Sequence, residues 1–400
     1  MKKKEFPTSI YRRVFAAGAI STAALALLPI ATFAQVTTGV TKNEIKLGGV
    51  FALSGPARLI MEPYEQGIRI VFNKVNADGG IYGRKINWIL DDDGYQPART
   101  LAGIKKLVER DEVFVLFGNL GTPTTKAVMP YVEQAKIPYF VAVASPEPIS
   151  RYTFGLMANY DQVMYQVTKY MVQKAGVKKP GYLYQNDDLG AVGRIGVERA
   201  LKELNVPLAA DVGYERGTND FGTQVLKLRD AGADGVISMG IGPATANGVK
   251  QATGIGYKPV WGTFSVGGSA LMYQLLGASV DGMVFGSEIE TADSPAAREV
   301  KTLLAKDFPG VPVDWGTMLG YANAKLMVEA LKAAGPNPTR EGVIAAVEGR
   351  SIDLGVMAPV NYASNKRTAA NAIAVFQWKN GKAERKTEWV PNVASINVVK

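Results

Sequence analysis

The 400-residue sequence contains no cysteine and no histidine. Without thiols and imidazoles, the chain cannot use a cysteine nucleophile, a Ser-His-Asp triad, a Cys/His zinc site, a haem held by His or Cys, or an iron–sulfur cluster. No disulfide can form, so cysteines give no information about the redox compartment. An enzyme of this composition would have to use carboxylates, lysine, tyrosine, serine or an oxygen-ligated metal.

The rest of the composition is that of a soluble globular protein. The chain is 47% hydrophobic and 20% charged, which excludes a disordered or low-complexity protein, and its length suits two domains. The net charge of +9 falls to +5 without Met1–Arg13, because that segment holds five basic residues and one acid. Since the remaining charges of both signs are interspersed, we expect a mixed solvated surface and no nucleic-acid partner.

The first 34 residues have the layout of a signal peptide. A basic start precedes Val14–Ala34, which carries no charge, contains Pro29 and ends in small residues. The alternative is a retained membrane anchor of about 20 residues, but Pro29 and the small-residue end favour cleavage after Ala34. Arg12-Arg13 resembles a twin-arginine motif, so both Sec and Tat export stay open. Because a lipoprotein needs a cysteine at its cleavage site, we expect no lipid anchor and a free periplasmic protein.

The remaining sequence alternates short apolar runs with amphipathic helix patterns. In Glu65–Ala77 the apolar residues recur on one helical face, and Val113–Phe117 is a continuous apolar run typical of a buried strand. Repeated strand–helix units predict parallel sheets with helices on both faces. The pattern restarts with a helix at Asp161–Ala175, so we expect two α/β units with a cleft between them.

Ligands of open parallel sheets bind beyond the carboxyl ends of the strands. Three loops directly follow predicted strands: Ser54–Pro56, Gly118–Thr125 and Ala142–Pro146. They are therefore the candidate ligand-binding loops.

The loop Phe117–Thr125 carries the strongest local signal. Its glycines turn the chain, Thr122 is expected to cap the next helix and Pro123 suits its first position. Free backbone N–H groups and the hydroxyls of Thr122, Thr124 and Thr125 would then face the cleft and attract an anion. An ordinary threonine cap with no ligand is an equally good interpretation. The loop lacks the Gly-Lys-Ser/Thr ending of a phosphate-binding loop, which disfavours a nucleotide.

Other polar loops have simpler interpretations. Asp91–Gly94 lacks the spacing of a calcium loop, and acids before a glycine at a strand end are usually a turn. Gly240–Pro243 has too few glycines for a dinucleotide site. Gln185–Gly190 is expected to begin a helix, with a place in the cleft as the alternative.

Several stretches together resemble the periplasmic solute-binding proteins of the leucine/isoleucine/valine type. They are Ile45–Gly48 leading into Leu53–Pro56, Asn76–Arg84, Asp91–Pro97, Phe117–Thr125 and Tyr184–Gly190. The resemblance covers nearly the whole chain after the signal segment, in the same order and with similar spacing.

The resemblance implies a fold. It is an α/β, two-lobed clamp of type I, in which each lobe is a parallel sheet flanked by helices and three crossovers join the lobes. The crossovers are expected near Met157–Ala158, Phe285–Gly286 and Gly355–Pro359. The N-terminal lobe is expected to comprise 41–157 plus 286–357, and the C-terminal lobe 158–285 plus 358–400.

The resemblance also implies a function. Such proteins bind a small solute between the lobes, close by hinge motion and deliver it to a membrane permease driven by an ATPase. We therefore expect a monomeric ABC-importer component that catalyses no reaction and needs no cofactor or metal. A ligand sensor built on the same clamp is one alternative. A carboxylate-based hydrolase is another, but the sequence offers no convincing pair of acids for it.

The positions of the ligand-binding residues follow from the same resemblance. The family's carboxylate-binding positions match Thr122, Ala144 and Ser145. The position of a glutamate that holds an ammonium group matches Phe264, and a first-lobe tyrosine position matches Ile60.

Two further departures concern the rim of the expected pocket. An aspartate that follows the first crossover in the family has no acidic counterpart here, where Asn159 and Tyr160 stand. A loop-tying disulfide of some relatives matches Tyr95 and Gly121, so Tyr95 is expected to pack beside Thr122 and to contact the ligand.

An ammonium group in a closed cleft needs an acid or several acceptors, because an unpaired buried charge is costly. Phe264 in place of an acid therefore favours a solute with a carboxylate or amide head and an apolar or aromatic body. Asp161 or Glu288 could still supply an acid, so a branched-chain amino acid stays an alternative.

Overall fold

The computed structural model describes residues 37–391, except 56, 142 and 146–149. The predicted signal peptide and its cleavage site at Ala34 lie outside the described residues, as do Pro56, Ala142 and Pro146 of the candidate loops. The chain divides into a unit Met1–Gln35 and a unit Val36–Lys400, and the described helices and strands belong to the second unit. In the described residues, no helix combines the length and hydropathy that crossing a membrane requires.

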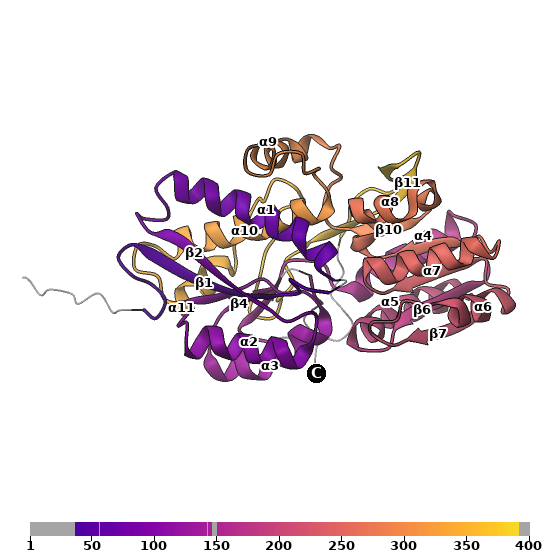
Figure 1. Cartoon of the computed structure of the whole chain (residues 1–400), viewed down its shortest axis with the longest axis horizontal. Helices are drawn as coiled ribbons and strands as arrows, with labels where there is room; N and C mark the ends of the chain where they lie inside the picture. The colour runs from indigo at the N-terminus through magenta and orange to yellow at the C-terminus, as the bar shows by residue number, and fades with distance from the viewer. Residues whose placement is uncertain (1–36, 56, 142, 146–149, 392–400) are drawn as a thin grey trace, which may run out of the picture. The chain divides into compact units, whose positions relative to one another are not determined.

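The first sheet has five parallel strands in the order β2-β1-β3-β4-β5. Helices α1 and α10 cover one face, and α2 and α3 cover the other (Figure 1). This is the arrangement that alternating strand and helix patterns predict. The bounds are β1 Glu44–Phe51, α1 Arg58–Ala77, β2 Lys85–Asp92, α2 Pro97–Glu109, β3 Val115–Phe117, α3 Thr122–Ala135, β4 Tyr139–Val141, β5 Thr153–Gly155, α9 Arg298–Asp307, α10 Trp315–Ala333 and α11 Arg340–Val347.

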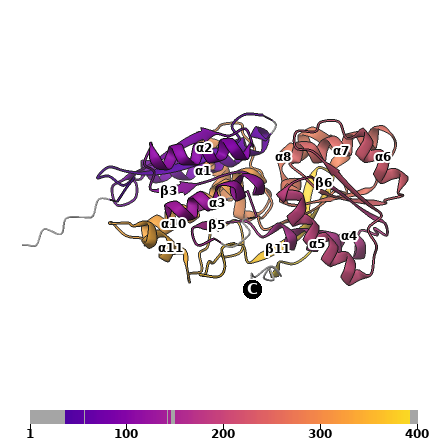
Figure 2. The same ribbon diagram turned by 90° about the horizontal axis from the view of Figure 1, so that it is seen from below.

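The second sheet follows the order β12-β11-β10-β9-β8-β6-β7, and β13 pairs with β11. Strands β6 to β10 are parallel, whereas β11 runs antiparallel to β10 and forms a hairpin with β12. Helices α4 and α5 cover one face, and α6, α7 and α8 cover the other (Figure 2). The bounds are α4 Tyr160–Gln173, β6 Pro180–Gln185, α5 Asp188–Leu204, β7 Ala210–Tyr214, α6 Gly222–Asp230, β8 Gly235–Met239, α7 Gly242–Gly254, β9 Val260–Thr263, α8 Ala270–Leu276, β10 Val284–Ser287, β11 Ala372–Lys379, β12 Lys382–Arg385 and β13 Val390–Pro391.

The chain passes between the two sheets three times. It leaves the first sheet after β5, leaves the second after β10, and returns to the second at β11. The last passage comes later than Gly355–Pro359, because Gly155 of β5 still exchanges backbone hydrogen bonds with Arg367 and Ala369. The second passage comes after, not within, β10. The other limits of the two predicted lobes stay predictions.

Helices α1 and α10 approach each other closely on the first sheet. A Cβ atom on Gly67 would lie 2.1 Å from the carbonyl oxygen of Thr317, and one on Gly320 would lie 2.0 Å from that of Tyr64. Only glycine allows this contact between helix backbones. The contact anchors the N-terminal half of α10, which follows α9 after the second passage between the sheets.

Candidate functional site

The loop after β3 forms one side of the site, and its cap differs from the prediction. Gly121, with φ of 104° and ψ of 139°, is the N-cap of α3, and Thr122 is the first helical residue. The expectation that Thr122 caps the helix is therefore wrong, because the positive φ of Gly121 makes the turn one residue earlier. The Thr122 hydroxyl instead accepts a hydrogen bond from the backbone N–H of Ser145 at 3.2 Å.

The next two threonines do not face the cleft as expected. The hydroxyl of Thr124 donates to the carbonyl oxygens of Gly121, at 2.8 Å, and of Leu120. The hydroxyl of Thr125 accepts from the side-chain amide of Asn119 at 2.9 Å. These groups stabilise the loop itself, so only Thr122 of the three stays a candidate ligand contact.

A chain of contacts joins this loop to the second sheet. The Ser145 hydroxyl lies 3.5 Å from Asn159 Oδ1 and accepts from the backbone N–H of Tyr160 at 3.4 Å. The ring centroids of Tyr160 and Phe264 lie 4.9 Å apart. We call Thr122, Ser145, Asn159, Tyr160 and Phe264 the cleft group. All five are buried, and Ala144, also buried, precedes Ser145 in the same segment.

Tyr95 packs beside the Thr122 loop, as expected. A Cβ atom on Gly121 would lie 2.3 Å from Cε2 of the buried Tyr95 ring. The Tyr95 hydroxyl accepts from the Gln185 amide of β6 at 3.4 Å, and the Arg216 guanidinium lies 5.1 Å from the ring centroid. Tyr95 therefore belongs to the first-sheet loops but contacts residues of the second sheet.

Ile60 also reaches the second sheet's elements. It is buried in α1, and its Cδ1 lies 3.8 Å from the position of a Cβ atom on Gly242, at the start of α7. The matched family position is a tyrosine, so an apolar group stands where a hydroxyl would be. This side of the site offers packing but no hydrogen bond.

An acid lies next to the cleft group, although Phe264 occupies the matched position. Glu288 follows β10 and is fully buried, and its Oε2 accepts from the Ser265 hydroxyl at 3.3 Å. Its Oε1 has no hydrogen-bond partner in the described chain. Burial raises the pKa of Glu288 to about 7, and Glu288 in turn helps raise the pKa of the buried Tyr160 hydroxyl.

Asp161 of α4 packs against α5, and its Oδ1, like Oε1 of Glu288, has no hydrogen-bond partner in the described chain. Its Oδ2 accepts from the Gln162 amide at 2.8 Å, and a Cβ atom on Gly196 of α5 would lie 1.9 Å from its carbonyl oxygen. Arg199 of α5 partly offsets the effect of burial on the pKa of Asp161. Of the two acids considered from the sequence, Glu288 is the one beside the cleft group. Because β10 has only four residues, the sequence signal for a strand directly before Glu288 is weak.

Charged residues form contacts across the rim. The Lys126 ammonium of α3 contacts the Asp188 carboxylate of α5. Arg216 pairs with Asp187 at 2.6 Å and also donates to the carbonyl oxygen of Tyr95 at 3.5 Å. A cavity of about 260 Å³ opens beside Tyr95, Gln185 and Arg216. These half-buried contacts join elements of the two sheets at the edge of the site.

The acidic run at the end of β2 makes a turn, as expected. Asp92 Oδ1 accepts from the backbone N–H groups of Leu53, Ser54 and Gly94 at 2.9 to 3.1 Å. Asp93 accepts from the backbone of Tyr95 at 2.8 Å. These acids hold two candidate loops in place. In the described part of the chain, no group of three or more acidic residues is placed to hold a metal ion.

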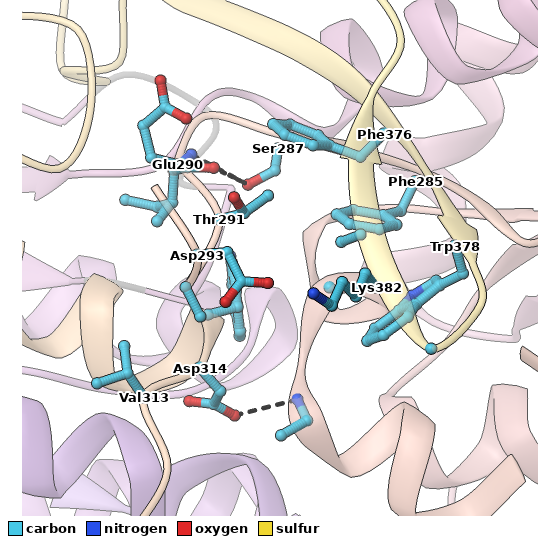
Figure 3. A pocket seen from close by; sticks show the side chains of 17 residues that line it. Phe285, Ser287, Glu290, Thr291, Asp293, Val313, Asp314, Phe376, Trp378 and Lys382 are labelled. Carbon is cyan, nitrogen blue, oxygen red and sulfur yellow. Dashed lines mark hydrogen bonds between the residues drawn. The ribbon is translucent and has the colours of Figure 1, made fainter. Parts of the chain in front are cut away.

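A separate cavity of about 140 Å³ lies where the second passage between the sheets begins. Figure 3 shows the rings of Phe285, Phe376 and Trp378 on one wall, and the carboxyl groups of Asp293 and Asp314 opposite them. Its lining combines β10 and β11 with the segments that lead into α10. None of the cleft group lines it, so it is separate from the candidate site, and we call it the hinge cavity because it adjoins the second passage between the sheets.

A two-lobed α/β fold with polar loops and an aromatic pair meeting between the sheets defines a solute-binding clamp. Comparison with known families agrees, since residues 44–383 match the model of the family described as periplasmic binding protein. The chain belongs to this family. The predicted family resemblance and the α/β fold class are thereby confirmed.

Relatives and solved structures support the same assignment. The chain is 24% identical over 382 residues to "Leu/Ile/Val-binding protein homolog 7" of Brucella abortus, with 89% of this chain and 94% of that protein covered. It superposes on a possible leucine/isoleucine/valine-binding protein from Rhodopirellula baltica with a TM-score of 0.80 and 24% identity, covering 88% and 98% of the two chains. A solute-binding protein of an ABC transporter from R. palustris, solved with benzoate, gives a TM-score of 0.80 at 18% identity, covering 88% and 98%.

Proposed function

We propose that this chain captures a small organic solute with a carboxylate or amide head and an apolar or aromatic body. It holds the solute between the two lobes and delivers it to a membrane permease driven by an ATPase. The arrangement of the cleft group supports this proposal most directly, because its polar end comes from the first sheet and its aromatic end comes from the second. A solute that touches both ends stabilises the closed arrangement and thereby shifts the population toward it.

The polar end suits an anionic or amide oxygen. Thr122 begins α3, where unsatisfied backbone N–H groups and the helix dipole favour negative charge. The hydroxyl of Thr122 accepts a hydrogen bond from the backbone N–H of Ser145, which holds the two residues at the same end of the site. Such a site binds a carboxylate without a cationic side chain.

The opposite end suits an apolar body. Tyr160 and Phe264 present two buried rings, and Ile60 adds an aliphatic side chain. Aromatic rings favour offset or edge contacts with another ring and bury a large apolar area. Benzoate, bound by the structural neighbour from R. palustris, has this combination of a carboxylate and an aromatic body.

A branched-chain amino acid is the second candidate, because Glu288 places an acid beside the cleft group. Its unpartnered Oε1 could accept from an α-ammonium group. The relatives with names of the leucine/isoleucine/valine type agree with this candidate. A branched-chain amino acid differs from the carboxylate with the same apolar body only in its α-ammonium group. Pairs of ligands that differ in this group therefore distinguish the two candidates.

Calorimetric titration of the refolded, ligand-stripped protein with matched pairs tests the proposal. The pairs are 4-methylpentanoate with leucine, and 3-phenylpropanoate with phenylalanine, which differ only by the α-ammonium group. We expect the acids without an ammonium group, and benzoate or benzamide, to bind more tightly than the amino acids. Binding confined to leucine, isoleucine and valine would establish the second candidate, and no binding by either class would contradict the proposed solute.

Replacing the Thr122 hydroxyl tests the polar end. Thr122→Val should weaken carboxylate binding by about 1–3 kcal/mol, because a buried head group loses a polar partner. Thr168→Val is the matched control, since Thr168 of α4 is also fully buried and its hydroxyl has no hydrogen-bond partner in the described chain. Calorimetry should show a larger dissociation constant for Thr122→Val and an unchanged one for Thr168→Val. Equal affinities would remove Thr122 from the site.

Replacing the ring of Phe264 by an aliphatic side chain tests the apolar end of the site. Phe264→Leu keeps an apolar side chain but loses the ring contact with Tyr160. Affinity for 3-phenylpropanoate should fall by about 0.5–1.5 kcal/mol more than affinity for 4-methylpentanoate, the range of an aromatic pair. Competition titrations with both acids measure this difference. Equal losses for the two ligands would argue against an aromatic body.

The export route is proposed from the sequence. Family membership implies a periplasmic protein, and we infer that a Sec or Tat signal is cleaved after Ala34. N-terminal sequencing of the protein from the periplasmic fraction should begin at Gln35. A retained N-terminus in the membrane fraction would support the anchor alternative.

A further inference from the structure

Glu288 is a buried acid for which the proposed solute has no matching group, because neither its carboxylate or amide head nor its apolar body needs an acid as a partner. It is the first residue after β10, and its neighbours Ser287 and Ile289 line the hinge cavity (Figure 3). Glu288 itself contacts Ser265, the residue after Phe264, and acts electrostatically on Tyr160. It therefore adjoins the aromatic end of the cleft group, with one carboxyl oxygen unpartnered.

The groups around Glu288 provide no positive charge. Ser265 of the turn after β9 donates its hydroxyl, and Tyr160 of α4 is the titratable group that faces it. Tyr95 lies beyond Tyr160 and is also buried and neutral, since burial raises its pKa. In the described chain, no lysine, arginine or second carboxylate acts on Glu288. An ionised carboxylate here would be buried without a counter-ion, which is costly.

A bound carboxylate makes ionisation less favourable still. Under the proposed function, the solute's negative charge lies at the Thr122–Ser145 end of the same closed cleft. Two anions with no cation between them repel each other in a medium of low dielectric constant, so one of them binds a proton. The solute carboxylate is stabilised by α3 N–H groups, whereas Glu288 has only the Ser265 hydroxyl and the N–H of its own backbone. The proton therefore goes to Glu288.

We propose that Glu288 is protonated in the ligand complex, so that capture of a carboxylate takes up one proton. This inference rests on the proposed function and adds a condition to it. The proton comes from the solvent and stays on the carboxyl group while the solute is bound. A zwitterionic amino acid would have the opposite effect, because its ammonium group would favour the ionised acid.

The inference gives a definite pH dependence. The free protein must be protonated at Glu288 before it binds a carboxylate, and the pKa of Glu288 is about 7. Affinity should be nearly constant below pH 6 and should fall roughly tenfold for each pH unit above 7. The protein would therefore load carboxylates best at neutral to mildly acidic pH.

Calorimetry in two buffers of different protonation enthalpy measures the proton directly. With benzoate or 4-methylpentanoate, which are ionised throughout, we expect an uptake of roughly 0.9 proton at pH 8 and of roughly 0.1 at pH 6. Glu288→Gln, which keeps the shape but cannot ionise, should show no uptake and an affinity independent of pH from 6 to 8. The exposed Glu198→Gln should behave like the wild type.

The outcomes separate this inference from the proposed function. Tight carboxylate binding with no proton uptake, or with proton release, would overturn the inference and leave the proposed function standing. Uptake that persists in Glu288→Gln would assign the proton to another group and overturn it as well. If no carboxylate or amide binds the wild type or the variant at pH 6, the proposed function fails, and the inference fails with it.

Discussion

Gly121→Ala should reduce solute affinity by roughly 30-fold or more, which corresponds to about 2 kcal/mol. Gly121 has φ of 104° and ψ of 139°, a conformation that a residue with a Cβ atom adopts at a cost of about 1–3 kcal/mol. The added methyl would also lie 2.3 Å from the ring of Tyr95. Relief requires the Thr122 loop or Tyr95 to move, and both belong to the site.

Gly79→Ala separates the clash from the backbone strain. Gly79 has φ of 103°, but nothing lies within 4 Å of its Cβ position. This control should lower the free energy of unfolding and leave affinity unchanged. Denaturant titration gives the stability of each variant, and calorimetry with 4-methylpentanoate gives the affinity. Equal affinities in both variants would mean that the Thr122 loop does not contact the solute.

Glu288→Gln should stabilise the ligand-free protein at pH 8 and have little effect at pH 4. Burial raises the pKa of Glu288 to about 7, so the folded state holds this proton more tightly than the unfolded state. The contribution of Glu288 to stability is therefore complete below an unfolded pKa of about 4.3 and is lost as pH rises through about 7. The loss is on the order of 4 kcal/mol, and glutamine avoids it.

Denaturant unfolding of both proteins across this pH range measures the difference. The gain in free energy of unfolding from the substitution should grow between pH 4 and pH 7 and then level off. Glu198→Gln on the exposed face of α5 should show no such trend. A gain that is the same at pH 4 and pH 8 would mean that Glu288 is not held protonated by its surroundings.

The fold could be predicted from the sequence because its elements carry strong local signals. Strand β3 agrees with the apolar run Val113–Phe117, and helix α4 agrees with the predicted helix Asp161–Ala175, each to within two residues. The short strands β5 and β10 could not be predicted from the hydrophobic pattern, since a strand of three or four residues gives little periodicity. The late return to the second sheet depends on the pairing of Gly155 with Arg367 and Ala369, which no local pattern reveals.

The candidate site was partly predictable for a different reason. Thr122, Ser145 and Tyr95 lie on or beside loops that follow strands, where parallel sheets place their ligands. The directions of individual side chains were not predictable. Thr124 and Thr125 bond to their own loop, because Gly121 ends the turn one residue earlier than a threonine cap would.

Glu288 shows what alignment to a family pattern misses. The matched position carries Phe264, yet an acid from a different segment, Glu288, accepts a hydrogen bond from Ser265, the residue after Phe264. Its burial and its lack of a cation depend on α4, β9 and β10 meeting in space. Sequence alone could name Glu288 as a possible acid but could not place it.

The central claim is that a small carboxylate closes the two lobes around itself, and a distance measurement between the lobes tests it most directly. Because the chain has no cysteine, Ala102→Cys in α2 and Lys202→Cys in α5, both exposed, can carry two spin labels without further changes. Benzoate or 4-methylpentanoate should narrow and shift the distance distribution at pH 6, and Thr122→Val should need more ligand for the same change. A distribution unaffected by saturating amounts of every acid, amide and branched-chain amino acid would contradict the account.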